Sequence, residues 1–138
     1  MSVARFLVDA SAIARYADPA VAARLDGLAM DGLAVSCGAV ELELLAAVRN
    51  TATRAKAVAL RAVAFEVLET TGADFRRAAE VQALLVERGD FGVAWPALLV
   101  AAVAERHGVT VLHCDPCYEV IGKLTEQAEE RVCEGDRR

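Results

Sequence analysis

The sequence lacks any hydrophobic run long enough to cross a membrane. Its longest apolar stretch is 95–104, well short of the roughly 20 residues that span a bilayer. The first apolar run ends in a charge at Asp9 and is too short for the core of a signal peptide. There is no low-complexity segment and no internal repeat, which argues against disorder and against a solenoid. We therefore expect an ordered cytoplasmic protein that does not enter a membrane.

Basic residues are also relatively few. The chain has 15 Lys and Arg against 20 Asp and Glu, a net charge of −5. This balance argues against a broad phosphate-binding surface, favours a basic partner, and still allows a nucleic-acid enzyme that touches only a few phosphates. Arg49, Arg54, Lys56 and Arg61 form a scattered basic stretch. We interpret it as a solvated helix face, with phosphate contacts as the alternative.

The length of the chain favours one domain over 1–138. Hydrophobic residues make up 56% of its 138 residues, enough to bury roughly two thirds of the unfolded surface in one core. The cysteines are Cys37, Cys114, Cys117 and Cys133. In a reducing cytoplasm we expect free thiols that place no constraint on the fold.

Strands and helices alternate along the sequence. Strand-like runs occur at 6–9, 33–37, 65–68 and 109–113, with a possible edge strand at 131–133. Helical patterns occur at 19–30, 39–49, 54–63, 74–88, 96–107 and 118–125, the second and third forming a pair or one bent helix. This order predicts an α/β fold with a parallel sheet of four or five strands and helices on both faces.

The helical patterns also indicate which residues form the core. Phe75, Leu85 and Val86 are expected on the buried face of the helix over 74–88. The stretch Ala97–Ala104 is apolar throughout, so its helix should be buried on nearly every side. Trp95 is interpreted as a buried anchor before that helix, with base stacking as the alternative.

Three acids are candidates for chemistry. Asp9 and Asp115 follow strands, and in parallel sheets sites form outside the carboxyl ends of the strands. Glu43 lies about one turn into the helix after the second strand, so three carboxylates could converge there and offer the oxygen ligands that Mg²⁺ prefers. Periodicity alone does not choose between Glu41 and Glu43.

Two segments resemble motifs of the PIN-domain family. The segment Phe-Leu-Val-Asp-Ala-Ser-Ala over 6–12 is similar to the family's opening, in which a strand delivers a catalytic Asp and a small hydroxyl residue follows. Asp9 and Ser11 match these positions. The segment over 37–44 resembles the second motif, which places the family acid at Glu43 and leaves Glu41 as a charge on the helix surface.

Two later segments extend the resemblance over nearly the whole chain. The third motif begins with an Asp before an apolar Ala-Ala run, and this chain has Ala97 at that position. In the fourth motif a strand ends in a polar residue and then Asp, which Asp115 matches. Cys117 occupies the position of an optional second Asp.

The resemblance implies a three-layer α/β/α PIN fold and a VapC-type toxin. It implies an endoribonuclease that holds Mg²⁺ or Mn²⁺ through Asp9, Glu43 and Asp115, with Ser11 supporting Asp9 from a second shell. The implied partners are the RNA substrate, a VapB-type antitoxin that blocks the site, and a second copy of the chain in a homodimer.

The departure at Ala97 has two possible origins. The chain is a natural member that lost the acid, or the acid was replaced to silence a toxic protein. We favour replacement because the rest of the site matches the family pattern. Either origin predicts an impaired or inactive nuclease, and the rival interpretation is an inert PIN-like module that acts only by binding an antitoxin.

Other readings of these residues are weaker. The Cys-x-x-Cys of Cys114 and Cys117 comes too late for a thioredoxin, and no second closely spaced pair completes a zinc site. A haloacid-dehalogenase-type phosphatase needs an acid where Ser11 stands. His107 and His113 are interpreted as a helix-end and a strand-end polar group, with catalysis as the alternative.

Overall fold

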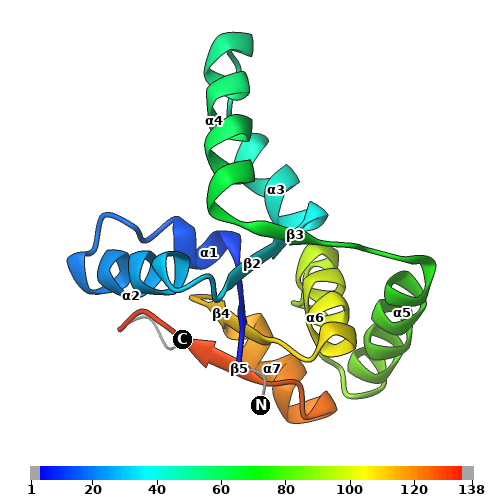
Figure 1. Ribbon diagram of the computed structural model, residues 1–138. Helices are drawn as coiled ribbons and strands as arrows, with labels where there is room; N and C mark the ends of the chain where they lie inside the picture. The colour runs from blue at the N-terminus through cyan, green and yellow to red at the C-terminus, as the bar shows by residue number, and fades with distance from the viewer. Residues whose placement is uncertain (1–3, 135–138) are drawn as a thin grey trace.

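The computed structural model describes residues 4–134 and contains one five-stranded parallel sheet. Its strands are β1 (Phe6–Val8), β2 (Ala34–Cys37), β3 (Glu66–Leu68), β4 (Thr110–His113) and β5 (Glu129–Arg131). The order across the sheet is β3-β2-β1-β4-β5 (Figure 1). The expected α/β fold with a parallel sheet is therefore confirmed. The edge strand begins two residues earlier than the sequence predicted.

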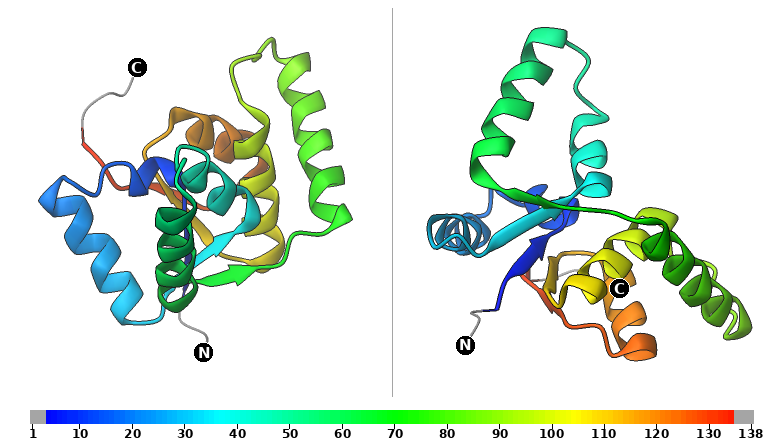
Figure 2. Two further views of the ribbon diagram at one scale, coloured as in Figure 1. Left: turned by 90° about the horizontal axis from the view of Figure 1, so that it is seen from above. Right: turned by 45° about the vertical axis from the view of Figure 1, so that its right-hand side comes forward.

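Helices cover both faces of the sheet. They are α1 (Ala10–Ile13), α2 (Pro19–Met30), α3 (Gly38–Leu45), α4 (Thr51–Ala64), α5 (Gly72–Glu87), α6 (Trp95–His107) and α7 (Pro116–Thr125). Leu7 of β1 packs into a core with α3, α5, α6 and α7, while its neighbour Val8 packs into a second core with α1 and α2. Successive strand residues point to opposite faces, so the two cores give the three-layer arrangement (Figure 2).

Side-chain caps explain where several helices begin. Asp18 accepts a hydrogen bond from the Ala20 amide at 2.9 Å and precedes Pro19, as the sequence predicted. Asp115 accepts from the Cys117 amide at 2.9 Å, so α7 begins at Pro116, earlier than the expected residue 118. The stretch expected to be a helical pair or one bent helix is two separate helices, α3 and α4.

Helix α6 is the centre of the larger core. Every residue from Ala97 to Ala104 is buried, as the sequence predicted. Two aromatic residues that were expected to be buried are not: Trp95 is 62% exposed and Phe75 is 58% exposed. Val86 is exposed too, so the buried face of α5 is formed by Val81, Leu85 and a carboxylate.

That carboxylate belongs to Asp74, in the first turn of α5. Its side chain is 1% exposed and accepts from the Arg106 guanidinium at 2.8 and 2.9 Å. Asp74 also accepts from the Thr71 amide at 2.8 Å and completes a capping box. The cap explains why α5 begins at Gly72. The Arg106 guanidinium, together with the Thr71 amide, lowers the pKa of Asp74 despite its burial.

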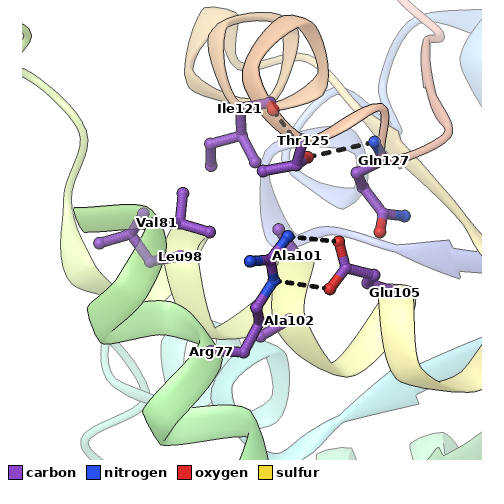
Figure 3. Close-up of a pocket in the computed structure, with 9 residues that line it drawn as sticks. All are labelled: Arg77, Val81, Leu98, Ala101, Ala102, Glu105, Ile121, Thr125 and Gln127. Carbon is purple, nitrogen blue, oxygen red and sulfur yellow. Dashed lines mark hydrogen bonds and ion pairs between the residues drawn. The ribbon is translucent and has the colours of Figure 1, made fainter. Parts of the chain in front are cut away.

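A small pocket lies between α5, α6 and α7 (Figure 3). Arg77 of α5 and Glu105 of α6 bridge it with hydrogen bonds of 2.8 and 3.1 Å. Thr125 and Gln127 close its far wall. None of the three acids singled out in the sequence lines this pocket.

One pair of cysteines departs from expectation. Cys114, after β4, and Cys133, after β5, are joined as a disulfide with Cα atoms 5.7 Å apart. Cys37 and Cys117 are free thiols. The expectation of four free thiols was therefore wrong for this pair, because the parallel pairing of β4 with β5 brings residues 19 apart in sequence into contact.

None of the helices within residues 4–134 has the length and apolarity of a membrane span.

The Asp74 pair yields a stability prediction. Asp74→Asn should lower the free energy of unfolding by about 1.5–3 kcal/mol at pH 7, because it removes the buried carboxylate that the Thr71 amide and the partly exposed Arg106 guanidinium bind. Since the folded-state pKa of Asp74 is lowered, its contribution is present above the unfolded pKa of roughly 3.9 and is lost as the pH falls through the folded value. Urea unfolding between pH 7 and pH 3 should show the difference between variant and wild type shrinking below about pH 4. A difference that stays constant over this range would contradict the assignment.

The cysteine assignments predict a thiol count. Cys37 is buried, and burial, followed by a hydrogen bond with Asp115 and the charge of that residue, raises the pKa of Cys117 to about 11. A thiol reagent near pH 8 should therefore react slowly with one group in the native protein, with two after denaturation without reductant, and with all four after reduction. Cys117→Ser should abolish the native reaction and leave the fold unchanged. Four reactive thiols in the denatured, unreduced protein would show that Cys114 and Cys133 are not bonded.

Candidate active site

Asp9 lies directly after β1 with its side chain 4% exposed. Its Oδ2 accepts from the Ser11 amide at 3.0 Å and from the Ser11 hydroxyl at 2.6 Å. Its Oδ1 accepts from the Tyr118 hydroxyl at 2.7 Å. A buried carboxylate is costly unless hydrogen bonded, and these three donors both satisfy Asp9 and fix its orientation.

Asp115 lies at the same edge of the sheet. Strands β1 and β4 are parallel neighbours with Val8 opposite Leu112, and the Asp9 amide donates to the Leu112 carbonyl at 2.9 Å. The Ser11 hydroxyl, which donates to Asp9, accepts in turn from the Cys114 amide at 3.0 Å. Ser11 therefore joins the ends of the two strands that carry the acids.

Glu43 reaches this edge from α3. Glu43 is exposed overall, but the burial of part of its side chain, followed by the negative charges of Asp9 and Asp115, raises its pKa. The three acids thus lie close enough to share one region of negative potential. The assignment of Asp9, Glu43 and Asp115 to one site stays a prediction from the sequence.

Glu41 is not the surface charge that the sequence suggested. It is half-buried and accepts from Arg61 Nε at 2.6 Å and from Arg61 Nη2 at 2.7 Å, in addition to the Ser36 hydroxyl. Burial opposes ionisation, but the hydrogen bonds from Arg61 and Ser36 outweigh it and lower the pKa of Glu41. This carboxylate is therefore committed to a structural ion pair with α4.

Sequence reasoning missed the part that Tyr118 plays at the site. Tyr118 is 2% exposed, and burial, followed by the charge of Asp9, raises its pKa well above the ordinary value. Its hydroxyl therefore stays protonated and donates to Asp9. The available signal was its spacing of three residues after Asp115, which puts it one turn into α7.

His113 fixes the position of Asp115 through a hydrogen bond with its backbone amide. Its ring is fully buried, and the centre of the ring lies 5.0 Å from the centre of the Tyr118 ring. Its Nδ1 accepts from the Asp115 amide at 3.1 Å, and its Nε2 lies 2.7 Å from a Glu129 carboxylate oxygen. These partners assign the ring proton to Nε2. His113 is thus a positioning residue beneath the acids, which is more than the strand-end polar group that we expected.

Ala97 adds no oxygen to the site. It lies in the first turn of α6, is 6% exposed, and shares the larger core with Tyr118. The helix begins at Trp95, one residue earlier than predicted, and this difference leaves Ala97 in the first turn. The position that the family motif gives to an acid is therefore occupied by a buried methyl group.

The donor set fits a hard divalent cation in its chemistry, because carboxylate oxygens are the ligands that Mg²⁺ and Mn²⁺ prefer. In its geometry it is incomplete. Within the described part of the chain, no three His, Cys, Asp or Glu side chains converge closely enough to form a metal site. The acids are thus suitable ligands in their chemistry, but their side chains in this structure do not form a metal site.

Comparison with known proteins places the chain among relatives of similar length. It is 37% identical over 129 residues to Ribonuclease VapC21 of Mycobacterium tuberculosis, covering 93% of this chain and 94% of that protein. It is 35% identical over 123 residues to Ribonuclease VapC51 of the same species, covering 89% of each chain.

Solved structures share the fold at low sequence identity. VapBC-1 from nontypeable Haemophilus influenzae matches with a TM-score of 0.74 at 12% identity, covering 94% of this chain and 98% of that one. VapBC from Salmonella typhimurium, bound to DNA, matches with a TM-score of 0.73 at 17% identity, covering 95% and 100%. A family model described as PIN domain matches residues 6–124, and with the two ribonuclease relatives it shows that this chain belongs to the PIN-domain family.

Proposed function

We propose that this protein is a VapC-type toxin, an endoribonuclease that depends on Mg²⁺ or Mn²⁺ and is weakened by Ala97. The observation that carries the proposal is the position of Asp9 and Asp115 at the carboxyl ends of neighbouring strands, with Glu43 near enough for their charges to raise its pKa. The ribonuclease names of its relatives support the choice of RNA as substrate.

In this proposal Asp9, Glu43 and Asp115 hold the cation. When bound, the cation lowers the pKa of a water molecule and neutralises charge on the phosphate. Ser11 and Tyr118 donate to opposite oxygens of Asp9 and keep the carboxylate in one orientation. Such supporting donors typically change metal affinity or activity by about 10- to 100-fold.

The geometry of the site also supports a weakened nuclease activity. Removing one carboxylate from a set of four takes away both a ligand and a negative charge. The remaining acids do not form a three-residue metal site within residues 4–134. We therefore propose that this chain, as it stands, is a poor nuclease that retains its substrate and partner surfaces.

The partners follow from the family and from the surface. We propose a VapB-type antitoxin as the inhibitor, since the matched structures are VapBC complexes and a net charge of −5 suits a basic partner. Leu42, Phe75 and Trp95 line an exposed apolar hollow between α3, α5 and α6, a suitable surface for a second copy in a homodimer. We further propose that 1–138 acts as one domain and works in the cytoplasm, where its RNA substrate is found.

A second candidate is an inert PIN-like module that works only by binding an antitoxin. Ala97 and the absence of a converged metal site among the described residues favour it. The two candidates differ in what an acid restored at position 97 should do.

Restoring that acid is the main test. Ala97→Asp should create Mn²⁺-dependent cleavage of total cellular RNA and toxicity that a cognate antitoxin neutralises, because the first turn of buried α6 holds residue 97 rigidly. A fourth buried carboxylate without metal should lower the melting temperature, and Mn²⁺ at 100 times its Kd should then stabilise the variant by about 2.7 kcal/mol.

The control is Asp9→Asn in the Ala97→Asp background, which removes a ligand; circular dichroism checks that this variant is folded, because Ser11 and Tyr118 donate to the replaced carboxylate. This control should abolish both cleavage and stabilisation by Mn²⁺. If Ala97→Asp folds but gains neither property, the nuclease proposal fails and the inert module takes its place.

The chain as it stands should bind Mn²⁺ weakly or not at all in calorimetric titration, because it lacks one carboxylate. Ala97→Asp should bind at least about tenfold more tightly. Tight stoichiometric binding by the unaltered chain would show that position 97 is dispensable for the metal.

A further inference from the structure

Residues 44–65 form a projection, here called the arm, whose charge is opposite to that of the rest of the chain. The arm comprises the last residues of α3, the connection 46–50, helix α4 and Phe65. All 20 Asp and Glu residues lie outside it, while Arg49, Arg54, Lys56 and Arg61 lie within it. A chain with a net charge of −5 therefore carries a locally positive segment.

The arm stands away from the body of the molecule. Helix α4 has no buried residue, and in Figures 1 and 2 it extends beyond the sheet beside α3. The connection 46–50 and the first turns of α4 form the end farthest from the sheet (Figure 1). Arg49, Arg54 and Lys56 belong to this end.

These three cations are available to a ligand. All are exposed, and within residues 4–134 no ion pair or hydrogen bond involves their side chains. Most other arginines of the body are committed: Arg24, Arg77 and Arg106, for example, pair with acids. Three free charges within eight residues therefore distinguish the outer end of the arm.

The fourth cation of the arm fixes its base. Arg61 binds Glu41 of α3 through two hydrogen bonds, and its guanidinium lies 4.5 Å from the centre of the Phe65 ring. A bidentate Arg–carboxylate pair defines direction as well as distance. The pair therefore ties α4 to the helix that carries Glu43, and the outer cations keep a defined relation to the acids.

We propose that Arg49, Arg54 and Lys56 bind the phosphate backbone of RNA and hold a strand across the acidic site. This inference rests on the proposed nuclease function. The acids repel a polyanion, so a nearby positive surface is needed to retain it. Arg49 follows Glu43 by six residues, which can span at most about 20 Å of chain.

The apolar side chains of the arm lie elsewhere along α4. Val58, Leu60 and Val63 are exposed in its later turns, while the free cations precede them. An apolar protein partner would bind the exposed apolar side chains, and a polyanion would bind the free cations. From residue 46 to Lys56 no large apolar side chain is exposed to hold a protein, and this favours RNA.

Ala97 makes a direct binding test practical, because the chain can be mixed with RNA under conditions of little turnover. The probe is a fluorescently labelled single-stranded RNA of about 20 nucleotides, with Kd measured between 50 and 200 mM NaCl. Each phosphate contact to a single strand contributes about 0.7 to the slope of log K against log salt. The triple variant Arg49→Ala, Arg54→Ala, Lys56→Ala should bind at least about tenfold more weakly at 100 mM salt and lose about 2 from that slope.

A matched control removes the same charge elsewhere. Arg76, Arg88 and Lys123 are exposed, lie outside the arm and have no ion pair among the described residues, so their triple alanine variant should change Kd less than about twofold. Neither triple variant removes a side-chain hydrogen bond or ion pair found within residues 4–134, and alanine favours helix. Circular dichroism should therefore match the wild type for both.

The outcomes separate the two proposals. If the wild type binds RNA and the arm variant binds equally well with the same slope, the arm inference fails and the nuclease proposal stands. If the wild type does not bind RNA even at 50 mM salt, both fail. If polyglutamate of equal charge competes as well as RNA and depends on the same three residues, the surface recognises an acidic polypeptide and the RNA inference is overturned.

Discussion

The need to satisfy one buried carboxylate organises the centre of this molecule. Asp9 cannot be buried at low cost without donors, and its donors come from two different elements, Ser11 of α1 and Tyr118 of α7. Ser11 also accepts from the end of β4. The hydrogen bonds that stabilise Asp9 therefore draw together β1, β4 and α7, the elements that also place Asp115, so stability and site geometry depend on the same contacts.

Local patterns predicted most of the fold because they are local in origin. Apolar runs, the proline at position 19 and the cap at Asp18 act within a few residues. They correctly indicated the strands and the start of α2, and they placed the starts of α3 to α7 one to three residues late. Exposure of Phe75 and Trp95 was mispredicted because it depends on what the tertiary structure leaves uncovered. The Cys114–Cys133 pairing was missed for a similar reason, since only the β4–β5 register brings the two residues together.

In the candidate site, too, local sequence predicted some features and tertiary contacts decided others. Strand ends marked Asp9 and Asp115 without any structure, whereas the choice between Glu41 and Glu43 required the family motif. The structure shows why periodicity could not decide: Glu41 is bound by Arg61, twenty residues later in the chain. His113 and Tyr118 were underestimated because a support beneath a site is defined by contacts with other elements, such as Glu129 of β5.

The exposed position of α4 has a consequence for how the protein unfolds. Because α4 contributes nothing to either core, the free energy needed to open it is set by its own helix and by the Glu41–Arg61 pair, not by the global stability of the sheet. Local opening of this segment leaves the strands and α6 intact. Helix α4 can therefore unfold while the rest of the protein stays folded. A protease that cleaves extended chain would cut α4 in this partly unfolded state before it cuts globally unfolded protein.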